Sequence, residues 1–498
     1  MQQISVYNSL SKQKEIFETL EPAHVGMYVC GPTVYSDVHL GNCRTFVSFD
    51  IIYRYLLHLG YKVRYVRNIT DVGHLEGDVD VGAEDKISKK ARLDKLEPME
   101  VVQKYANGFH AMMHTFNTLS PSIEPRATGH IIEQIEMIQM ILERGFGYEV
   151  NGSIYFDTPK FIAEGQPYGA LSGRVVEDLL QETRDDLKKQ DEKRNPSDFA
   201  LWIKADPSHL MRWDSPWSVG FPGWHLECSA MSTKYLGKHF DIHGGGNDLK
   251  FPHHENEIAQ NLGACGETPA KYWLHSNMLL MNGKKMSKSD GNSVTPTELF
   301  SGTSDHFSQA FHPMVVKFFM LQAHYRSTLD LTDDALIAAE KGYRRLMEAY
   351  KILKGLETDN ESVPSELDNE IQEIIEGAHA DMADDFNTPR VLARLFDLTS
   401  KINALAGGQL STGNVTIATL DRMKETFNTF LFEVFGLRET TNQDENGLVE
   451  GLMQLIIDLR KNARDNKDWP TADKIRDGLN QLKVQLKDGK EGTTWSPQ

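Results

Sequence analysis

The sequence has 498 residues, which is too long for one ordinary domain, so we expect about two to four domains with a well-buried core. Its apolar runs are too short to span a membrane, and the first residues, Met1-Gln2-Gln3-Ile4-Ser5, lead into polar sequence without a basic head or an apolar stretch. These features exclude a membrane protein and a secretory signal, and they predict a cytoplasmic protein.

The cysteines also argue against a secreted protein. Four occur, Cys30, Cys43, Cys228 and Cys265, and none belongs to a CxxC pair, so we expect no disulfide framework. We assign Cys43 and Cys265 to core packing, with Cys265 closing a helix that begins near His253.

The formal net charge of -18 disfavours a nucleic-acid ligand when it is taken alone. The charge is uneven, however. Residues 357–385 are densely acidic, whereas residues 460–490 carry nine Lys and Arg against five Asp and Glu, a difference of +4. An RNA can therefore bind local basic segments while the acidic remainder limits non-specific binding.

The first 120 residues alternate strand-like and helix-like segments. A β-prone run over residues 25–32 ends in Gly-Pro, residues 41–59 show helical apolar spacing, and residues 61–70 form a second strand-like run. This order predicts the first half of a doubly wound parallel α/β sheet over residues 1–120.

The pattern changes between residues 121 and 212, which we interpret as an insertion. It contains a helical segment, a short strand and a long charged stretch, at residues 131–144, 153–156 and 174–194. Residues 213–300 restore the sheet, with a β-like run over residues 274–281 and then Asn282-Gly283, a pair suited to a tight turn.

The remainder of the chain is predicted to be almost entirely helical. A connecting segment, residues 301–328, shows helical spacing around residues 311–324, and nearly everything from Leu329 onward reads as helix. Two breaks stand out: a Ser/Glu/Asp-rich linker at residues 357–367 and a Gly/Thr/Asn-rich loop at residues 407–416. This predicts a helical bundle over residues 329–440 and a small carboxyl-terminal module over residues 441–498.

Two short motifs look like parts of one ATP site. His39-Leu40-Gly41-Asn42 follows the first predicted strand and opens the first predicted helix. Free backbone N–H groups and the helix dipole favour phosphate at such a helix start, and an imidazole and an amide can add hydrogen bonds there.

The second motif is a lysine-rich turn. Lys284, Lys285 and Lys288 follow the Asn282-Gly283 turn, with Gly283 and Gly291 as hinges. Flexible ammonium groups there can close over a departing pyrophosphate. A solvated surface turn is the simpler interpretation of three lysines taken alone.

Some residues have the chemistry of metal ligands. Cys228, His253 and Glu257 can bind a metal, and His253 and Glu257, four residues apart, share one helix face. His254 and Glu257, three residues apart, can serve as well, and scattered cysteines are usually core residues. Spacing alone leaves these alternatives open.

The motifs and their surroundings resemble a known family. His39-Leu40-Gly41-Asn42 and Lys285-Met286-Ser287-Lys288-Ser289 resemble the HIGH and KMSKS signatures of class I aminoacyl-tRNA synthetases, with Asn42 in the place of the second histidine. Further runs, which cover nearly the whole chain, narrow the resemblance to the cysteinyl-tRNA synthetase family. They are Cys30-Gly31-Pro32-Thr33-Val34-Tyr35, Gly223-Trp224-His225-Leu226-Glu227-Cys228-Ser229-Ala230-Met231, Asp241-Ile242-His243-Gly244-Gly245-Gly246 and Phe251-Pro252-His253-His254-Glu255-Asn256-Glu257.

The resemblance implies a Rossmann-like catalytic fold split by the insertion, then a helical anticodon-binding bundle and a small anticodon-recognition module. It implies a monomeric enzyme that uses ATP with Mg²⁺ to join L-cysteine to tRNA(Cys) through a cysteinyl-adenylate. A zinc ion selects the substrate thiolate over the serine hydroxyl, so we hypothesise that no editing domain is needed.

The resemblance also assigns residues to the site. The implied zinc ligands are Cys30, Cys228, His253 and Glu257. The implied catalytic residues are His39, Asn42, Lys285 and Lys288, and the ATP-binding residues are His39, Gly41, Asn42, Gly246, Asp248 and Lys288. Gly31, Thr33, Trp224 and His243 are implied to contact the amino acid. Taken singly, a Trp beside Pro-Gly is more often core and a glycine triplet more often a loop.

The carboxyl-terminal residues suggest contacts with tRNA. Trp469 is a candidate platform for base stacking, and Arg464, Asp473 and Asp488 are candidates to hydrogen-bond base edges. An amphipathic surface helix with a Trp in its first turn is the alternative.

Three other functions remain as alternatives. A related cysteine ligase that uses a small-molecule amine is disfavoured by the long helical half and its Trp495 tail. A zinc-stabilised RNA-binding protein has no need of a lysine lid. A synthetase for another amino acid fits the implied zinc ligands less well than a thiol substrate does.

Overall fold

The computed structural model describes residues 2–72, 86–174, 192–207, 209–286, 291–361, 364–439, 443–466, 468–481, 484–489 and 492–497. The chain divides into two compact units, Met1–Leu437 and Arg438–Gln498. We describe each unit by itself.

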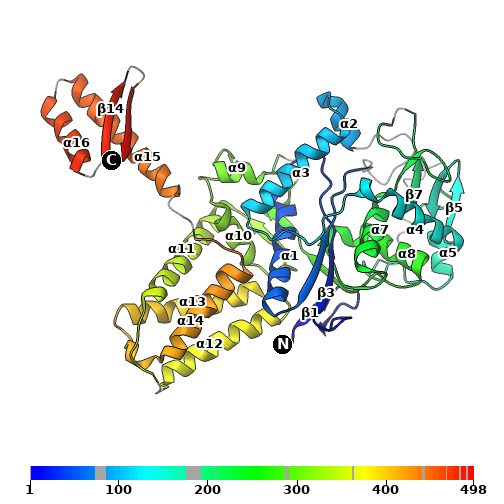
Figure 1. Ribbon diagram of the computed structural model, residues 1–498, viewed down its shortest axis with the longest axis horizontal. Helices are drawn as coiled ribbons and strands as arrows, with labels where there is room; N and C mark the ends of the chain where they lie inside the picture. Colours follow the sequence, from blue (N-terminus) through cyan, green and yellow to red (C-terminus); the bar gives the residue numbers. More distant parts are fainter. Residues whose placement is uncertain are drawn as a thin grey trace. The chain divides into compact units, whose positions relative to one another are not determined.

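A four-stranded parallel sheet forms the centre of the first unit, with the strand order β10-β9-β3-β4. Its strands are β3 (His24–Val29), β4 (Lys62–Arg67), β9 (Phe240–Gly246) and β10 (Ala270–Ser276). Helix α1 (Leu40–His58) connects β3 to β4, and α8 (His253–Cys265) connects β9 to β10 (Figure 1). The predicted parallel α/β fold, split by an insertion, is confirmed.

The strand order creates a switch point between β3 and β9. The connection from β3 leads to one edge of the sheet and the connection from β9 to the other. Ligands of open α/β sheets bind at such a point, beside the carboxyl ends of the two strands. The predicted strands 25–32 and 61–70 both end earlier, at Val29 and Arg67. Beyond them the two segments are joined by an isolated bridge between Thr33 and Thr70.

The insertion carries its own antiparallel sheet, β5-β6-β7-β8. The strands are β5 (Gly147–Val150), β6 (Ser153–Phe156), β7 (Phe199–Lys204) and β8 (Gly220–Pro222), with helices α4 (Ile131–Glu143) and α5 (Thr158–Ala163) beside them. Strand β8 pairs with β7 although it lies beyond residue 212, where we expected the insertion to end. Most of the charged stretch 174–194 lies outside the described residues.

Helices α7 (Trp224–Leu236) and α8 lie between two hydrophobic cores. Cys228 and Ile258 belong to the main core, whereas Leu226, Ala230 and Ala259 belong to the core of the insertion. Both helices are therefore buried on two sides, and their polar side chains are removed from water. Helix α8 ends at Cys265, as predicted.

The run predicted as one strand over residues 274–281 is two strands. Strand β10 ends at Ser276, and β11 (Leu279–Met281) belongs to a different sheet, with β12 (Lys284–Lys285) and β13 (Leu329–Leu331). The break follows from Asn277, whose N–H donates to the carbonyl of Tyr325 instead of continuing the ladder. The predicted tight turn is present, with positive φ at Asn282 (50°) and Gly283 (74°).

Helices α2 and α3 precede the insertion, and α9 and α10 lead into the helical bundle. The remaining elements of the first unit are β1 (Ser5–Asn8), β2 (Gln13–Ile16), α2 (Lys86–Asp94), α3 (Pro98–Thr115), η1 (Ala127–His130), η3 (Asn247–Lys250), α9 (Pro296–Ser301), α10 (Pro313–Leu321), α11 (Asp333–Gly355), α12 (Glu366–Ala383), α13 (Thr388–Ala406), η4 (Thr412–Asn414), α14 (Ile417–Phe427) and the π-helix η5 (Asn428–Val434).

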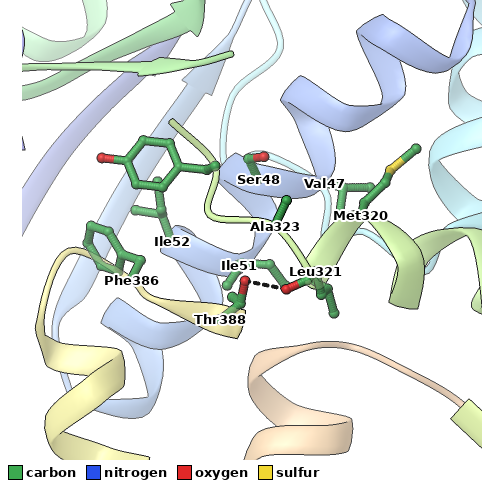
Figure 2. Close-up of a pocket in the computed structure, with 10 residues that line it drawn as sticks. Val47, Ser48, Ile51, Ile52, Met320, Leu321, Ala323, Phe386 and Thr388 are labelled. Carbon is green, nitrogen blue, oxygen red and sulfur yellow. Dashed lines mark hydrogen bonds between the residues drawn. The ribbon is translucent and has the colours of Figure 1, made fainter. Parts of the chain in front are cut away.

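The bundle of α11 to α14 joins the sheet domain through α1 and α10. Figure 2 shows a small pocket at this joint, lined mainly by apolar side chains of α1 and α10 and by Phe386 and Thr388. The Thr388 hydroxyl donates to the carbonyl of Leu321 at 2.8 Å. This bond fixes the start of α13 on the end of α10.

The second unit contains two helices and a hairpin. They are α15 (Gln443–Asp465), α16 (Trp469–Gln481), β14 (Val484–Gly489) and β15 (Gly492–Pro497). The Asp468 carboxylate accepts from the N–H of Thr471 at 3.2 Å and caps the start of α16. The prediction that nearly everything after Leu329 is helical, apart from two breaks, is therefore wrong at this hairpin and at β13.

Candidate active site and metal centre

The first signature forms a reciprocal cap at the start of α1. Nδ1 of His39 accepts from the N–H of Asn42 at 3.3 Å, and Oδ1 of Asn42 accepts from the N–H of His39 at 3.5 Å. A Cβ built on Gly41 would lie 2.9 Å from His39 Nδ1. The position of the His39 ring in the cap therefore favours glycine at residue 41. Asn42 thus caps the helix, a role that the motif alone did not reveal.

Arg44 ties the first signature to the segment that carries the second. This buried guanidinium donates to the carbonyls of Asn277 and Met278, at 3.0 and 2.6 Å, and to that of Ser327. The methyl carbon of Met286 would lie 3.7 Å from a Cβ built on Gly41. The two signatures, far apart in the sequence, are neighbours in the fold.

The lysine-rich turn begins in a short exposed strand, β12. Lys285 lies in β12 and is exposed to solvent, as is Lys284. Lys288 lies outside the described residues.

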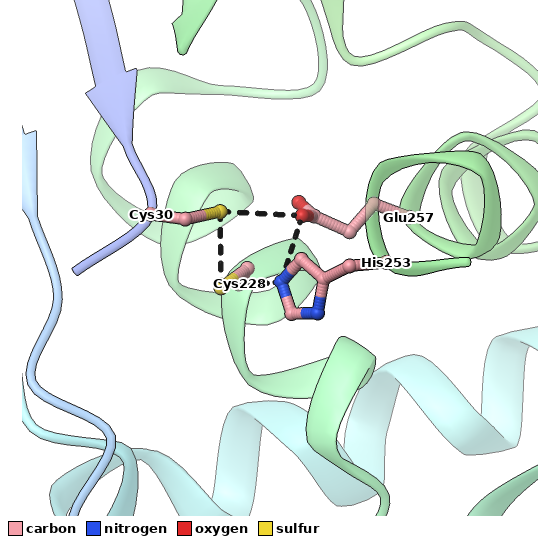
Figure 3. A group of neighbouring side chains, drawn as sticks. All are labelled: Cys30, Cys228, His253 and Glu257. Atoms are coloured by element: carbon pink, nitrogen blue, oxygen red, sulfur yellow. Dashed lines mark hydrogen bonds and ion pairs between the residues drawn. The ribbon is translucent and has the colours of Figure 1, made fainter. Parts of the chain in front are cut away.

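Four potential metal ligands meet where β3 ends between α7 and α8 (Figure 3). Sγ of Cys30 lies 3.6 Å from Sγ of Cys228 and 3.5 Å from Oε1 of Glu257. Nε2 of His253 lies 3.4 Å from Sγ of Cys228 and 3.2 Å from Oε1 of Glu257. All four side chains are buried, and their ligand atoms lie within 4.8 Å of one another. This group can hold a metal ion.

A second arrangement overlaps with the first, because His254 also reaches Cys30. Its Nε2 lies 3.3 Å from Cys30 Sγ and 4.0 Å from Oε1 of Glu257. Its Nδ1 is 2.9 Å from Nε2 of His275, whose Nδ1 is 2.9 Å from the Ser9 hydroxyl. The group with His253 contains both cysteines, which makes it the better match for a metal that prefers sulfur.

The metal-ligand group has a distinctive charge pattern without a metal. Burial opposes ionisation of Glu257, but His243 and His253 lower its pKa to about 2. Burial also opposes the charge on His253, but Cys228 and Glu257 raise its pKa to about 10. Burial and the neighbouring Cys228 raise the pKa of the Cys30 thiol well above its usual range. Cys30 and His253 therefore hold protons that metal binding must displace.

The sequence matches models of two protein domains. Residues 16–341 match the class I (C) tRNA synthetase catalytic domain, and residues 379–439 match the DALR domain. The chain is 52% identical over 502 residues to the cysteine-tRNA ligase of Bacteroides thetaiotaomicron, covering 99% of both chains. It is 47% identical to that of Deinococcus radiodurans, covering 99% of this chain and 96% of the relative.

The chain belongs to the cysteine-tRNA ligase family. Solved class I synthetases share its fold at low sequence identity. A Mycobacterium tuberculosis methionyl-tRNA synthetase matches with a TM-score of 0.54 and 15% identity, over 82% of this chain and 89% of that one. A putative Campylobacter jejuni arginyl-tRNA synthetase matches with a TM-score of 0.54 and 12% identity, over 85% and 94%. Within the described residues, no helix is long and apolar enough to cross a membrane.

Two of the amino-acid contacts that this family resemblance implied lie directly against the metal ligands. Nε2 of His243 is 2.8 Å from Oε2 of Glu257, and its ring stacks on Trp273 with centroids 4.3 Å apart. The Trp224 ring lies 4.4 Å from that of His253. His243 is fully buried, whereas Trp224 is half-buried.

The other two implied amino-acid contacts, Gly31 and Thr33, follow Cys30. The Gly31 N–H donates to Oδ1 of Asn68 at 2.8 Å, and a Cβ on Gly31 would lie 1.6 Å from the Asn68 carbonyl oxygen. No side chain fits there. Thr33 is half-buried beside Thr70.

The glycine run that ends β9 serves close packing. A Cβ on Gly244 would lie 2.2 Å from the Phe49 ring on α1, and one on Gly245 would lie 2.8 Å from the ring of His254. A Cβ on Gly246 would lie 2.4 Å from Oδ1 of Asp248, whose side chain is exposed. The three glycines are buried, and Asp248, two residues further on, is exposed.

Two buried residues beside the potential metal ligands, Tyr28 and Glu227, were not predicted from the sequence. Tyr28 lies near the end of β3, two residues before Cys30, which directly follows that strand. Burial and Cys228 raise the pKa of Tyr28 well above its usual range. Burial also raises the pKa of Glu227, which precedes Cys228, well above its usual range. Their positions next to the implied ligands were the available signal.

The four candidate tRNA contacts lie in the second unit. Trp469 begins α16 and is 56% exposed, and Asp473 follows one helical turn later in an ion pair with Arg476 at 3.1 Å. Arg464 is exposed in the last turn of α15. Asp488 lies in β14.

Proposed function

We propose that the chain activates L-cysteine with ATP and transfers the cysteinyl group to tRNA(Cys). One observation carries the proposal: a buried group of two cysteines, a histidine and a glutamate lies at the switch point of the sheet whose strand β3 leads into the first ATP signature. This combination joins a thiol-selective pocket to a nucleotide site.

The metal-ligand group is suited to zinc. In a tetrahedral site with Zn–S near 2.3 Å and Zn–N or Zn–O near 2.0–2.1 Å, neighbouring ligand atoms lie about 3.3–3.8 Å apart. The separations of 3.6, 3.5, 3.4 and 3.2 Å in this group fit that arrangement. Cys30, Cys228, His253 and Glu257 would hold the ion, with His243 orienting Glu257. When bound, zinc supplies a Lewis acid that favours a thiolate over a hydroxyl.

Activation needs in-line positioning and charge neutralisation more than a protein nucleophile. The cysteine carboxylate attacks the α-phosphate of ATP, and the bond to pyrophosphate breaks. His39, Gly41 and Asn42 contact the triphosphate at the start of α1, and Lys285 and Lys288 neutralise the departing pyrophosphate. Mg²⁺ accompanies ATP, as in phosphoryl transfer generally.

The remaining pocket residues orient the substrates. Gly246 and Asp248 contact the nucleoside, with the Asp248 carboxylate accepting from ribose hydroxyls, while Gly31, Thr33 and Trp224 surround the amino acid. His243 acts through Glu257. A terminal ribose hydroxyl of the tRNA then takes the acyl group from the adenylate.

The direct test is cysteine-dependent exchange of pyrophosphate into ATP without tRNA. We expect strong exchange with cysteine and very little with serine, followed by charging when tRNA(Cys) is added. Absence of exchange by the zinc-loaded protein would contradict the proposal. Hydrolysis of seryl products would contradict the hypothesis that selection needs no editing.

The second unit is the candidate anticodon reader. The exposure of Trp469 supports a stacking platform, since a Trp that only anchored the first turn would be covered. Arg464, Asp473 and Asp488 are proposed to contact base edges. A folded Trp469→Ala variant with unchanged tRNA affinity would remove the stacking role.

We also propose that the enzyme is a monomer in the cytoplasm, where charged tRNA is consumed, and that residues 329–440 and 441–498 serve the anticodon. Size-exclusion chromatography with light scattering tests the oligomeric state. A small-molecule amine as acceptor is disfavoured, because the relatives named as tRNA ligases match over 99% of the chain.

A further inference from the structure

A group of basic side chains gathers where the β1–β2 hairpin meets residues 169–174 and the turn η3. The hairpin is fixed on β10 by Asn8, whose Nδ2 donates to the carbonyl of Lys271 at 3.0 Å and whose Oδ1 accepts from the N–H of Trp273 at 3.0 Å. Lys12 is exposed in the hairpin turn, with a φ of 60°. The position of Lys12 is therefore set by the sheet.

The turn at residues 169–172 is fixed by hydrogen bonds to α8. The buried carboxylate of Glu255 accepts from the N–H of Gly169 at 2.7 Å and from that of Ser172 at 2.9 Å. A Cβ built on the following Gly173 would lie 2.8 Å from Nζ of Lys12. The hairpin and this turn are thus in close contact at the Lys12 ammonium group.

The segment that ends at Arg174 also contacts the residue that follows η3. The guanidinium of Arg174 lies 4.4 Å from the centre of the Phe251 ring, and Lys250 immediately precedes Phe251. Lys250 is half-buried at the end of η3. Burial lowers its pKa, and the charges of Arg326 and Lys12 lower it further.

Aspartates neutralise two nearby cations, Arg326 and Lys14. Asp385 pairs with Arg326 at 2.6 Å, and Asp384 pairs with Lys14 at 2.6 Å. No ion pair or side-chain hydrogen bond joins the ammonium groups of Lys12 and Lys250 to any described residue, including Asp248 in the same turn. A half-buried ammonium without a counter-charge is costly, and an anionic ligand would remove that cost.

We propose that Lys12 and Lys250 bind phosphodiester groups of the tRNA near its acceptor end. The inference rests on the proposed function and adds an RNA surface on the first unit. The signatures assigned to the ATP phosphates lie on α1 and β12 and not on the hairpin or η3, whose Asp248 is assigned to the ribose. Lys12 and Lys250 are therefore available to a second phosphate ligand. Lysine side chains act there as mobile point charges that follow a flexible backbone.

The test compares Lys12→Met and Lys250→Met with Lys14→Met, a control on the same hairpin whose charge is already paired with Asp384. We expect each of the two variants to raise the KM for tRNA about fivefold. The slope of log affinity against log salt concentration should fall by the amount that corresponds to about one phosphate contact. Lys14→Met should show neither effect.

Cysteine-dependent pyrophosphate exchange without tRNA supplies the reference rate for each variant. An unchanged tRNA KM and salt slope in a double variant with an unchanged melting temperature would overturn the inference. An equal loss of exchange without tRNA would also overturn it, because the lysines would then serve ATP. Failure of the parent enzyme to exchange with cysteine would instead refute the proposed function.

Discussion

The metal-ligand group and the first signature lie at the same end of the central sheet, but they are built in opposite ways. Cys228, His253 and Glu257 are buried, and each contacts another ionisable side chain. His39 is exposed and caps a helix together with Asn42. The chemistry assigned to each explains the difference, because selection of a thiol needs exclusion of water, whereas phosphates arrive and leave with their own hydration and metal.

The comparison predicts that changes in the buried group strongly affect metal binding and folding, whereas changes in the signature leave zinc content unchanged and cost little stability. The largest effect should come from a ligand. Replacement of Cys228 by Ser should abolish zinc binding and lower cysteine-dependent exchange more than about 100-fold, because loss of even an outer-shell partner costs 10–100-fold. Zinc content and exchange are measured together, with Cys265→Ser as the control cysteine outside the group. Full zinc content in Cys228→Ser would contradict the assignment.

The middle of α1 tests the same contrast within one helix. Asp50 is buried, and its carboxylate contacts Arg54 at 2.9 Å and Lys317 at 3.2 Å. Asp50→Ala removes the carboxylate that contacts both buried cations and should lower the free energy of unfolding by about 3–5 kcal/mol. Urea denaturation measures the change, with Asp421→Ala as an exposed control. A loss below 1 kcal/mol, on the order of a surface pair, would show that these charges are not effectively buried.

Zinc binding should depend steeply on pH. Cys30 and His253 have raised pKa values, with that of His253 near 10, so both are protonated at pH 7 and must lose a proton to become ligands. Below the pKa of His253, affinity should therefore rise with pH by about 100-fold per unit, because two protons are displaced. Calorimetry in buffers of different ionisation enthalpy counts the protons. Release of none would contradict the charge pattern.

His243 separates an orienting role from direct contact with the substrate. His243→Phe keeps a ring against Trp273 but cannot hydrogen-bond Glu257, so zinc affinity should fall about 10–100-fold. Competition with a chelator measures it. Unchanged zinc affinity with a raised KM for cysteine would instead assign His243 to the substrate.

The smallest effect is expected at the exposed signature. Asn42→Ala removes one half of the cap and should cost about 1 kcal/mol of stability, with zinc content unchanged. Thermal melting measures the cost, and Asn42→Asp, which retains an acceptor, is the matched variant. Equal losses in both variants would show that the cap is not the role of this side chain in stability.

The sequence predicted what local spacing controls. His253 and Glu257 lie four residues apart on one helix, and their convergence follows from helix geometry alone. The tight turn at Asn282-Gly283 likewise follows from local backbone preference. The parallel sheet follows from the alternation of strands and helices.

Tertiary contacts decided the rest. Spacing allowed either His253 or His254 as a ligand, and only the packing of α8 beside α7 brings His253 to Cys228 while His254 bonds to His275. The β14–β15 hairpin and the separation of β10 from β11 depend on partners that local periodicity does not reveal. The capping role of Asn42 could not be predicted from the motif, because it depends on the backbone conformation at the start of α1.

The central claim is that the buried group holds zinc and that the substrate thiol joins it. X-ray absorption at the zinc edge, measured with and without cysteine, tests this most directly. We predict two sulfur ligands, from Cys30 and Cys228, in the protein alone and a third when cysteine binds, with no change on adding serine. A sulfur count that stays at two with saturating cysteine would contradict the account.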